Sequence, residues 1–175
     1  VHKELIDFYR AIKDGHSRDI YSFMEAHPNT EETYYQVRGK QPETSLENAQ
    51  RFYYLRKTCF RGMLRYNKKG EFNIPFGRYK TYQFEELLNQ EYEKLLKNTE
   101  IFNTGFEEIF ANYNSPDNFM FLDPPYDSEF TDYGYCTFGK TEHQTLAKCF
   151  KDTKIKCLMI IGKTDFIVDL YKDYI

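Results

Sequence analysis

The sequence lacks the features of a membrane-spanning or secreted protein. No apolar run in its 175 residues reaches the roughly 18 residues that a membrane-spanning helix needs. No charged and then apolar leader opens the chain, so no secretory signal is visible. Because the first residue is Val1 rather than methionine, the sequence alone does not exclude a leader that has been removed. We therefore expect a cytoplasmic protein that binds no membrane.

Tryptophan is absent and cysteine is scarce. The four cysteines and the four histidines are scattered without the close paired spacing of a zinc site, so we expect reduced thiols and no metal. The cysteines are Cys59, Cys136, Cys149 and Cys157. Phenylalanine and tyrosine are plentiful, at sixteen each, and supply ring surface for packing and stacking.

The most informative feature is a set of four residues that ends a short apolar run. The run 119–122 is followed by Asp123, Pro124, Pro125 and Tyr126. An apolar run that stops at two prolines predicts a buried strand ending at the carboxyl edge of a sheet, where open α/β sheets bind ligands. The simpler interpretation is a proline-rich turn in which Asp123 is an ordinary turn residue.

This segment resembles the signature of methyltransferases that modify an exocyclic amine of a DNA base, most often adenine. The residue types suit that chemistry, because the lone pair of the adenine amine is delocalised into the ring. The Asp123 carboxylate and the Pro124 carbonyl can each accept one N–H hydrogen bond, which directs the lone pair at a methyl donor. Proline locks φ and so holds that carbonyl still. Tyr126 can stack on a base that has swung out of the duplex.

Positive charge is concentrated between residues 51 and 80. Nine lysines and arginines lie there against one acidic residue, Glu71, whereas residues 81–110 hold seven glutamates and two lysines, and the whole chain carries −3. This asymmetry is typical of a surface that binds nucleic-acid phosphates, although a solvated charged face has the same composition. Glycines and asparagines between aromatic residues predict an ordered loop or hairpin, with Gly70 and Gly77 permitting tight turns.

The same stretch carries a second resemblance. Residues 59–80 closely resemble the target-recognition segment of the Dam-like DNA adenine methylases, and the blocks 65–67, 70–73 and 75–80 are nearly identical to the family pattern. Residues 34–38 are similar to the same recognition domain. The recognition segment precedes the Asp-Pro-Pro-Tyr segment, as it does in the family, and the resemblance covers nearly the whole chain.

The resemblance implies a site-specific enzyme that transfers a methyl group from S-adenosylmethionine to the exocyclic amine of adenine in double-stranded DNA by base flipping. It also implies a monomer and a short palindromic target similar to GATC. The cytoplasm that it implies is that of a bacterium or of the host of a phage or other virus. The implied catalytic residues are Asp123, Pro124, Pro125 and Tyr126, and the implied cofactor contacts are Asp123, Gly105 and Phe106. The implied DNA contacts are Phe60, Arg61, Met63, Arg65, Asn67, Lys68, Lys69, Pro75 and Arg78.

Within that set, Arg65 matches an arginine that reads a guanine edge, and Pro75 lies where the family contacts a neighbouring thymine. Arg61 departs from the family pattern, because many relatives have asparagine at this position, which is thought to fill the gap left by the flipped base. The flipping contact is therefore not carried over to Arg61, whereas the activation chemistry is unaffected.

The expected fold is α/β, with a partial Rossmann-like methyltransferase sheet and a mostly helical target-recognition domain. Apolar residues at helical spacing predict a helical domain over residues 1–82, in which Asn29 and Ser45 cap the third and fourth helices. Residues 83–175 predict an incomplete catalytic segment with a parallel sheet, because helices alternate with strands. The expected helices are 84–96, 106–113, 141–150 and about 165–175, and the expected strands are 100–102, 119–122 and 155–161.

Two parts of the family pattern have no match. The glycine-rich turn after a first strand and the acidic ribose-binding residue have no counterpart, because the first glycine, Gly15, lies between two expected helices. We therefore expect a piece of a larger enzyme that binds duplex DNA in a salt-dependent way, binds S-adenosylmethionine weakly and methylates nothing alone. Three alternatives stay open: a non-catalytic DNA-binding module, an α/β protein without a nucleic-acid role, and an enzyme acting on the cytosine amine. Serine in place of Asp123 would favour the last.

Two other motifs predict no function. Gly162-Lys163-Thr164 looks like the end of a phosphate-binding loop, but the glycine required five residues earlier is Cys157. Glu142 and His143 could suggest acid–base chemistry, but the sequence offers them no partner, so we expect a surface pair.

Overall fold

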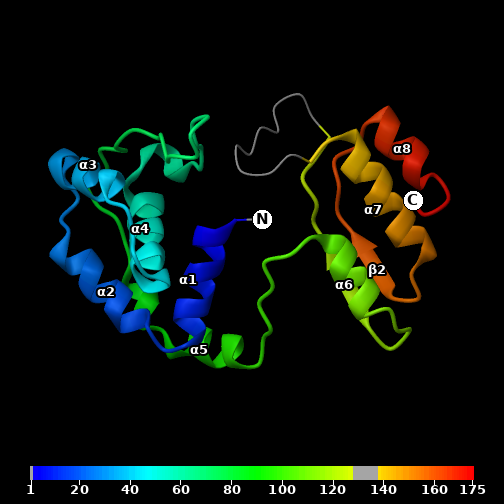
Figure 1. The fold of residues 1–175 in the computed structure, drawn as a ribbon, viewed down its shortest axis with the longest axis horizontal. Helices are drawn as coiled ribbons and strands as arrows, with labels where there is room; N and C mark the ends of the chain where they lie inside the picture. Colours follow the sequence, from blue (N-terminus) through cyan, green and yellow to red (C-terminus); the bar gives the residue numbers. More distant parts are fainter. Residues whose placement is uncertain (1, 128–137) are drawn as a thin grey trace. The chain divides into compact units, whose positions relative to one another are not determined.

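The computed structural model describes residues 2–127 and 138–175, and these form two compact units that divide between Asn103 and Thr104 (Figure 1). The first unit contains α1 (Lys3–Lys13), α2 (Ser17–Ala26), α3 (Glu31–Gly39), α4 (Ser45–Thr58), η1 (Phe60–Gly62), η2 (Glu85–Leu88) and α5 (Gln90–Lys97). The second contains α6 (Phe106–Asn112), β1 (Phe119–Leu122), α7 (Lys140–Asp152), β2 (Lys156–Met159) and α8 (Asp165–Tyr171). The chain is thus a mixed α/β protein, as expected, and mostly helical.

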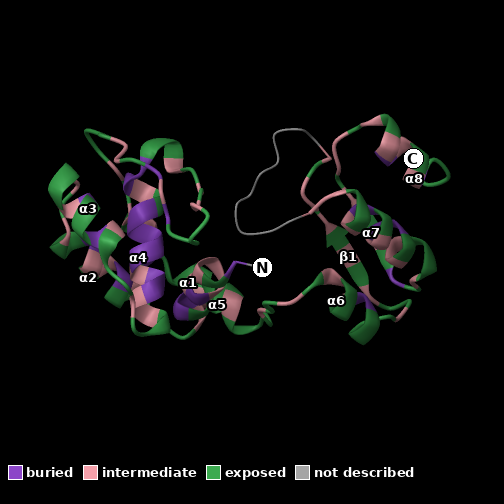
Figure 2. Cartoon of the chain, turned by 45° about the horizontal axis from the view of Figure 1, so that its top comes forward, coloured by how far each residue is buried: buried purple, intermediate pink, exposed green. Residues whose placement is uncertain are grey.

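Helix α4 is the centre of the first unit. Helices α1, α2 and α3 all pack against it, and Figure 2 shows buried residues along most of its length. Two fully buried tyrosines in this core keep their hydroxyls satisfied, since Tyr34 donates to the Ile74 carbonyl at 2.7 Å and Tyr54 donates to the Pro28 carbonyl at 3.0 Å. Burial raises the pKa of both phenols, so they remain neutral donors.

The expected helices over residues 1–58 form, but two of their caps are wrong by one residue. Thr30, not Asn29, caps α3 by accepting a hydrogen bond from the Thr33 amide at 3.2 Å. Thr44, not Ser45, caps α4, and Glu47 completes a capping box by bonding back to the Thr44 amide at 3.2 Å. Asn29 makes a tertiary contact instead, donating to the Tyr79 carbonyl at 2.8 Å.

The boundary between the units lies about twenty residues after the expected position between residues 82 and 83. The expected helix 84–96 is two elements, η2 and α5, and both pack on the first unit, η2 against α2 and α5 against α1. Leu87 is buried in the same core as α4, and Leu96 packs against that core. The acidic composition after residue 81 therefore marks a change of surface charge and not a change of domain.

The expected strand 100–102 does not form in the structure. Side chains of α1 bond to the backbone there, because Lys13 Nζ donates to the Thr99 carbonyl at 2.8 Å and Arg10 donates to the Ile101 carbonyl at 3.0 Å. These contacts hold the segment as an extended connection on α1, outside any sheet.

The second unit is built on two parallel strands, as the alternation of helices and strands predicted. Phe119 pairs with Lys156 and Leu122 with Met159, so β2 is shorter than the expected strand 155–161. On one face, Met120, Leu122, Cys157 and Met159 pack against the core that includes α6 and α7.

The strands are not buried on both faces, contrary to expectation. Phe119 is 66% exposed and Phe121 is 55% exposed, and Leu158 on the paired strand shares that exposed face. The pattern of alternating exposure is that of a sheet covered by helices on one side (Figure 2). Because both faces carry apolar side chains, the sequence hides this alternation.

The helices at 106–113, 141–150 and 165–175 are confirmed as α6, α7 and α8 with small shifts of their ends. Thr164 caps α8, accepting a hydrogen bond from the Ile167 amide at 3.2 Å. In the part of the chain that the structure describes, no helix combines the length and apolar character needed to cross a membrane.

Candidate functional site

The Asp-Pro-Pro-Tyr segment begins at the carboxyl end of β1. Asp123 follows Leu122 directly and is exposed, Pro124 and Pro125 are half-buried, and the Tyr126 ring is 43% exposed. The two prolines restrict the backbone between the carboxylate and the ring. The segment therefore presents an acceptor and an aromatic face to solvent from a stiff backbone at the edge where α/β sheets bind ligands.

Gly105 and Phe106 lie at the start of α6. Gly105 is the exposed residue before the helix, and the half-buried Phe106 ring packs against the core that also holds Leu122, the residue before Asp123. The Phe106 and Phe138 ring centroids are 5.9 Å apart. One core thus carries both the start of α6 and the end of β1, although the residues are well separated in sequence.

Sequence reasoning assigned nothing to the segment after β2, yet this segment touches the Asp-Pro-Pro-Tyr region. The Ile160 amide donates to the Leu122 carbonyl at 2.9 Å, and the Thr164 hydroxyl donates to the Asp127 carboxylate at 2.8 Å. A side chain at Gly162 would meet Tyr126. No local pattern reveals these contacts, because they join residues nearly forty positions apart.

His143 is not part of a surface pair, contrary to expectation. Its side chain is 0% exposed, the Phe138 ring packs edge-on against it at 4.9 Å between centroids, and neither ring nitrogen has a hydrogen-bond partner in residues 2–127 and 138–175. Burial lowers the pKa of the imidazole, although the nearby carboxylates of Asp127 and Glu142 oppose this. Glu142 has a separate role, since it accepts the Gly139 amide at 2.7 Å ahead of α7, which lowers its own pKa.

Replacing His143 by leucine should weaken the pH dependence of stability. An imidazole that stays neutral in the fold takes up a proton in the unfolded chain below its ordinary pKa of 6.5. The wild-type free energy of unfolding should therefore fall as pH drops from 7 to 5.5, by up to about 1.4 kcal/mol per pH unit below that value. Denaturant unfolding of both proteins at the two pH values measures this. The contribution of His2 cancels in the comparison, and an equal loss in both proteins would contradict the prediction.

The basic stretch contains a hairpin, as expected. An antiparallel bridge joins Tyr66 to Phe72, and a second bridge joins Cys59 to Phe76 at its base. At the tip, the Gly70 amide donates to the Asn67 carbonyl at 2.9 Å, and Gly70 has a φ of 77°, which favours glycine. The hairpin thus holds residues 59–77 as an ordered projection from the end of α4.

Gly77 serves a different purpose from the expected turn. A Cβ atom there would lie 2.7 Å from the Cys59 carbonyl oxygen and 2.8 Å from that of Thr58. The Gly77 amide donates to the Thr58 carbonyl at 2.8 Å, so two backbone segments approach closely at this point. Glycine is required at position 77 by this close approach at the base of the hairpin.

Most of the residues expected to contact DNA are exposed on or beside this hairpin. Asn67 is the exception, because its side chain is half-buried and holds the turn, accepting the Lys69 amide at 2.9 Å and donating to Glu71 at 2.7 Å. The Arg65 guanidinium is held in place by Asn73, because its Nε donates to the Asn73 side chain at 2.9 Å. The exposed residues are Phe60, Arg61, Met63, Arg65, Lys68, Lys69, Pro75 and Arg78.

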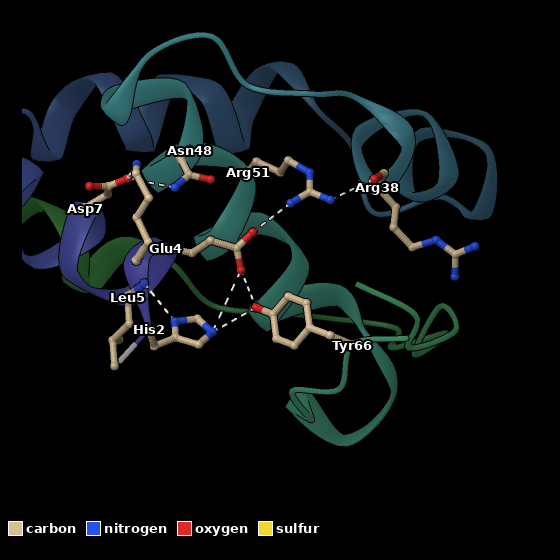
Figure 3. A network of polar contacts seen from close by, with 9 residues as sticks. His2, Glu4, Leu5, Asp7, Arg38, Asn48, Arg51 and Tyr66 are labelled. Atoms are coloured by element: carbon tan, nitrogen blue, oxygen red, sulfur yellow. Dashed lines mark hydrogen bonds and ion pairs between the residues drawn. The ribbon is translucent and has the colours of Figure 1, made fainter. Parts of the chain in front are cut away.

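Two of the nine basic residues face inward and do not form part of a phosphate-facing surface. Arg51 is buried and pairs with Glu4 at 2.9 Å, while its other nitrogen donates to the Arg38 carbonyl at 2.8 Å (Figure 3). Lys57 pairs with Glu86. The remaining seven are exposed. Glu4 also accepts the Tyr66 hydroxyl, so this network fastens the hairpin to α1.

The described residues contain no group of three or more histidine, cysteine, aspartate or glutamate side chains placed to hold a metal ion. Cys59, Cys149 and Cys157 are free thiols, and burial raises the pKa of each. Cys136 lies outside the described residues.

The whole chain matches a known protein family. The family described as D12 class N6 adenine-specific DNA methyltransferase matches residues 1–175. The chain belongs to this family. It is 62% identical over 175 residues to the type II methyltransferase M.CviBI of Paramecium bursaria Chlorella virus NC1A, a match that covers 100% of this chain and 67% of the relative.

Other relatives extend the comparison to cellular organisms. The type II methyltransferase M.MjaIII of Methanocaldococcus jannaschii is 36% identical over 197 residues, covering 99% of this chain and 68% of the relative. The DNA adenine methylase of Haemophilus influenzae is 28% identical over 186 residues, covering 98% of this chain and 65% of the relative. The chain therefore spans about two thirds of the length of these relatives.

Membership confirms the reaction class that the Asp-Pro-Pro-Tyr and recognition segments predicted. This adenine-specific DNA methyltransferase acts on DNA, and the alternatives of an enzyme for the cytosine amine and of a protein without a nucleic-acid role are wrong. The roles of individual residues stay predictions.

Proposed function

We propose that the protein transfers a methyl group from S-adenosylmethionine to the exocyclic amine of an adenine that has been flipped out of a short palindromic site in double-stranded DNA. The observation that carries the proposal is the exposed Asp123 carboxylate at the carboxyl end of β1, followed by two prolines and an exposed tyrosine. The match of the whole chain to an adenine methyltransferase family supports it.

Each residue of the Asp-Pro-Pro-Tyr segment has a role in the proposed reaction. The Asp123 carboxylate and the Pro124 carbonyl each accept a hydrogen bond from one N–H group of the adenine amine, so the nitrogen becomes pyramidal and its lone pair points at the methyl group. As the nitrogen bonds to the methyl carbon, the bond between that carbon and the sulfonium sulfur of the donor breaks and the thioether leaves. The nitrogen gains a positive charge that the carboxylate stabilises until one of the two N–H protons is released. Tyr126, whose ring is exposed, stacks on the flipped base. Pro125 keeps the ring and the carboxylate at a fixed separation along the backbone.

The residues present suit one edge of the methyl donor. Asp123 supplies a solvent-exposed carboxylate, Gly105 has no side chain at the start of α6, where the Glu107 carboxylate lies beside it, and Phe106 supplies a ring. Phe106 and Leu122 pack on one core. S-adenosylmethionine when bound supplies an activated methyl group on a sulfonium. In the proposed enzyme the two strands are part of a Rossmann-like methyltransferase sheet.

The hairpin supplies recognition in this proposal. Arg65 reads a guanine edge, Pro75 contacts a neighbouring thymine, and the exposed Lys68 and Lys69 at the tip bind phosphates. Phe60, Arg61, Met63 and Arg78 complete the contact surface, and Asn67 holds the turn that presents Lys68 and Lys69. The proposed target is a GATC-like palindrome, read by a monomer in the cytoplasm of a bacterium or of a virus-infected host.

A methylation assay tests the proposal directly. The full-length protein is incubated with S-adenosylmethionine carrying a labelled methyl group and a duplex that contains one GATC site. We expect label in N6-methyladenine after the DNA is digested to nucleosides. Duplexes with one substituted base pair at each position serve as controls. Label in cytosine, or none in DNA, contradicts the reaction. Equal label in all duplexes contradicts only the proposed GATC-like site and leaves the proposed reaction standing.

A further inference from the structure

The segment that follows β2 contacts the Asp-Pro-Pro-Tyr segment and its two flanking residues at three positions. Strand β2 runs parallel to β1 and leads into α8 (Figure 1). The first contact is a backbone bond, in which the Ile160 amide donates to the Leu122 carbonyl at 2.9 Å. It extends the pairing of the two strands to the residue immediately before Asp123.

The second contact is between Gly162 and Tyr126. A Cβ atom at position 162 would lie 3.4 Å from both Cβ and Cγ of Tyr126 and 3.5 Å from its Cδ2. One methyl group would therefore reach ordinary contact distance, whereas the further methyl groups of a branched side chain would compete with the ring for space. Glycine lets the Tyr126 ring lie against the backbone after β2.

The third contact is a hydrogen bond between side chains, at the residue that follows Tyr126. The Thr164 hydroxyl donates to Asp127 Oδ2 at 2.8 Å and accepts the Ile167 amide at 3.2 Å as the cap of α8. A hydroxyl has one hydrogen to donate, and here the Asp127 carboxylate receives it. Both residues are partly buried, so this charge-assisted bond is shielded in part from water.

We propose that Gly162, Thr164 and Asp127 are positioning residues for methyl transfer. They hold Asp123 and Tyr126 in place, because the Asp-Pro-Pro-Tyr segment is attached to the chain after β2 at both of its ends. The inference rests on the proposed roles of Asp123 and Tyr126. It assigns a function to the Gly162-Lys163-Thr164 run that is unrelated to phosphate binding. A displaced Tyr126 would weaken stacking on the flipped base, and a displaced Asp123 would slow the reaction, since small misplacements of reacting groups are costly.

A double-mutant cycle on Thr164 and Asp127 separates positioning from helix capping. Thr164→Val removes both bonds of the hydroxyl, Asp127→Ala removes the contact between segments and keeps the capping bond to Ile167, and Thr164→Ser keeps both. We expect kcat to fall about tenfold in Thr164→Val and in Asp127→Ala, with no further fall in the double variant and near wild-type kcat in Thr164→Ser. The KM for DNA should change much less than kcat.

Gly162 provides an independent readout through the flipped base. With 2-aminopurine at the target position, fluorescence reports how the base stacks in the site. Gly162→Ala should leave fluorescence and kcat close to wild type, whereas Gly162→Val should change the fluorescence and lower kcat. Equal behaviour of the two variants would overturn the role assigned to Gly162.

The outcomes distinguish this inference from the proposed function. If Asp123→Ala is inactive while Thr164→Val and Asp127→Ala keep wild-type kcat, the positioning role is wrong and the catalytic role of Asp123 stands. Additive losses in the double variant would make Thr164 a helix cap only. If Asp123→Ala itself keeps wild-type activity, the proposed function of the segment fails and the inference fails with it.

Discussion

Replacing Asp123 by alanine in the full-length enzyme is expected to lower the rate of methyl transfer by about a hundredfold or more, which is typical for the loss of one preorganised group that stabilises developing charge. The carboxylate lies exposed at the end of β1, where it can accept a hydrogen bond from the adenine amine. It acts on the reacting atom, so DNA affinity should stay within a few-fold of wild type. Single-turnover methylation and equilibrium DNA binding, measured on the same preparations, separate the two effects.

A matched control uses Asp117, an exposed aspartate of the same unit that lies just before β1. Asp117→Ala removes the same charge from the opposite end of the strand and should leave the rate unchanged. Near wild-type methylation of adenine by Asp123→Ala would rule out the assigned role of the carboxylate. A similar loss in both variants would point to the charge of the unit and not to the position of one group.

Helices were predictable from this sequence because their apolar spacing is strong, but their first residues were not. Both cap errors arise where two capping residues are adjacent, Asn29 beside Thr30 and Thr44 beside Ser45. The glutamate three residues after Thr44 is the local signal that decides the second case. In the first case Asn29 bonds to the backbone of Tyr79, fifty residues away, which no local pattern contains.

The Asp-Pro-Pro-Tyr segment could be recognised because it is contiguous, whereas the residues that pack around it could not be predicted. Asp123 to Tyr126 can be recognised from four adjacent residues, whereas the contacts of Thr164 and Gly162 depend on how β2 pairs with β1. His143 shows the same limit. A lone histidine beside a glutamate gives no sign of burial, which comes from tertiary packing that includes the rings of Phe138 and Phe166.

The composition of the basic stretch shows how many positive charges it holds, but not which of them point toward the protein core and which toward solvent. Arg51 and Lys57 both lie on α4, where they meet Glu4 from α1 and Glu86 from η2. Those two positive charges stabilise the fold of the first unit. The hairpin residues after α4 carry the exposed charge, and Arg65 stands out among them because Asn73 holds its guanidinium.

Replacing Arg65 by alanine should therefore lower discrimination at a single base pair by about 1–3 kcal/mol, the usual contribution of a two-pronged arginine contact to guanine. Nε donates to the Asn73 side chain, and Nη2 donates to the Asn73 carbonyl at 3.4 Å, so Asn73 fixes the orientation of the guanidinium. The N–H groups of Nη1 and the second N–H of Nη2 are then directed toward the base edge in the proposed contact. Arg65→Lys keeps the charge but not the fork, so it should lose discrimination nearly as fully. Binding to the cognate duplex and to duplexes substituted at each base pair measures the effect.

Lys68 and Lys69 provide the control on the same hairpin. Both are exposed at its tip, so alanine at either position should weaken all sequences alike and flatten the dependence of affinity on salt. Arg65→Lys should leave that salt dependence close to wild type, because the charge is kept. If Arg65→Ala instead weakens the cognate and substituted duplexes equally, Arg65 contacts only phosphate, and another residue of the hairpin reads the guanine.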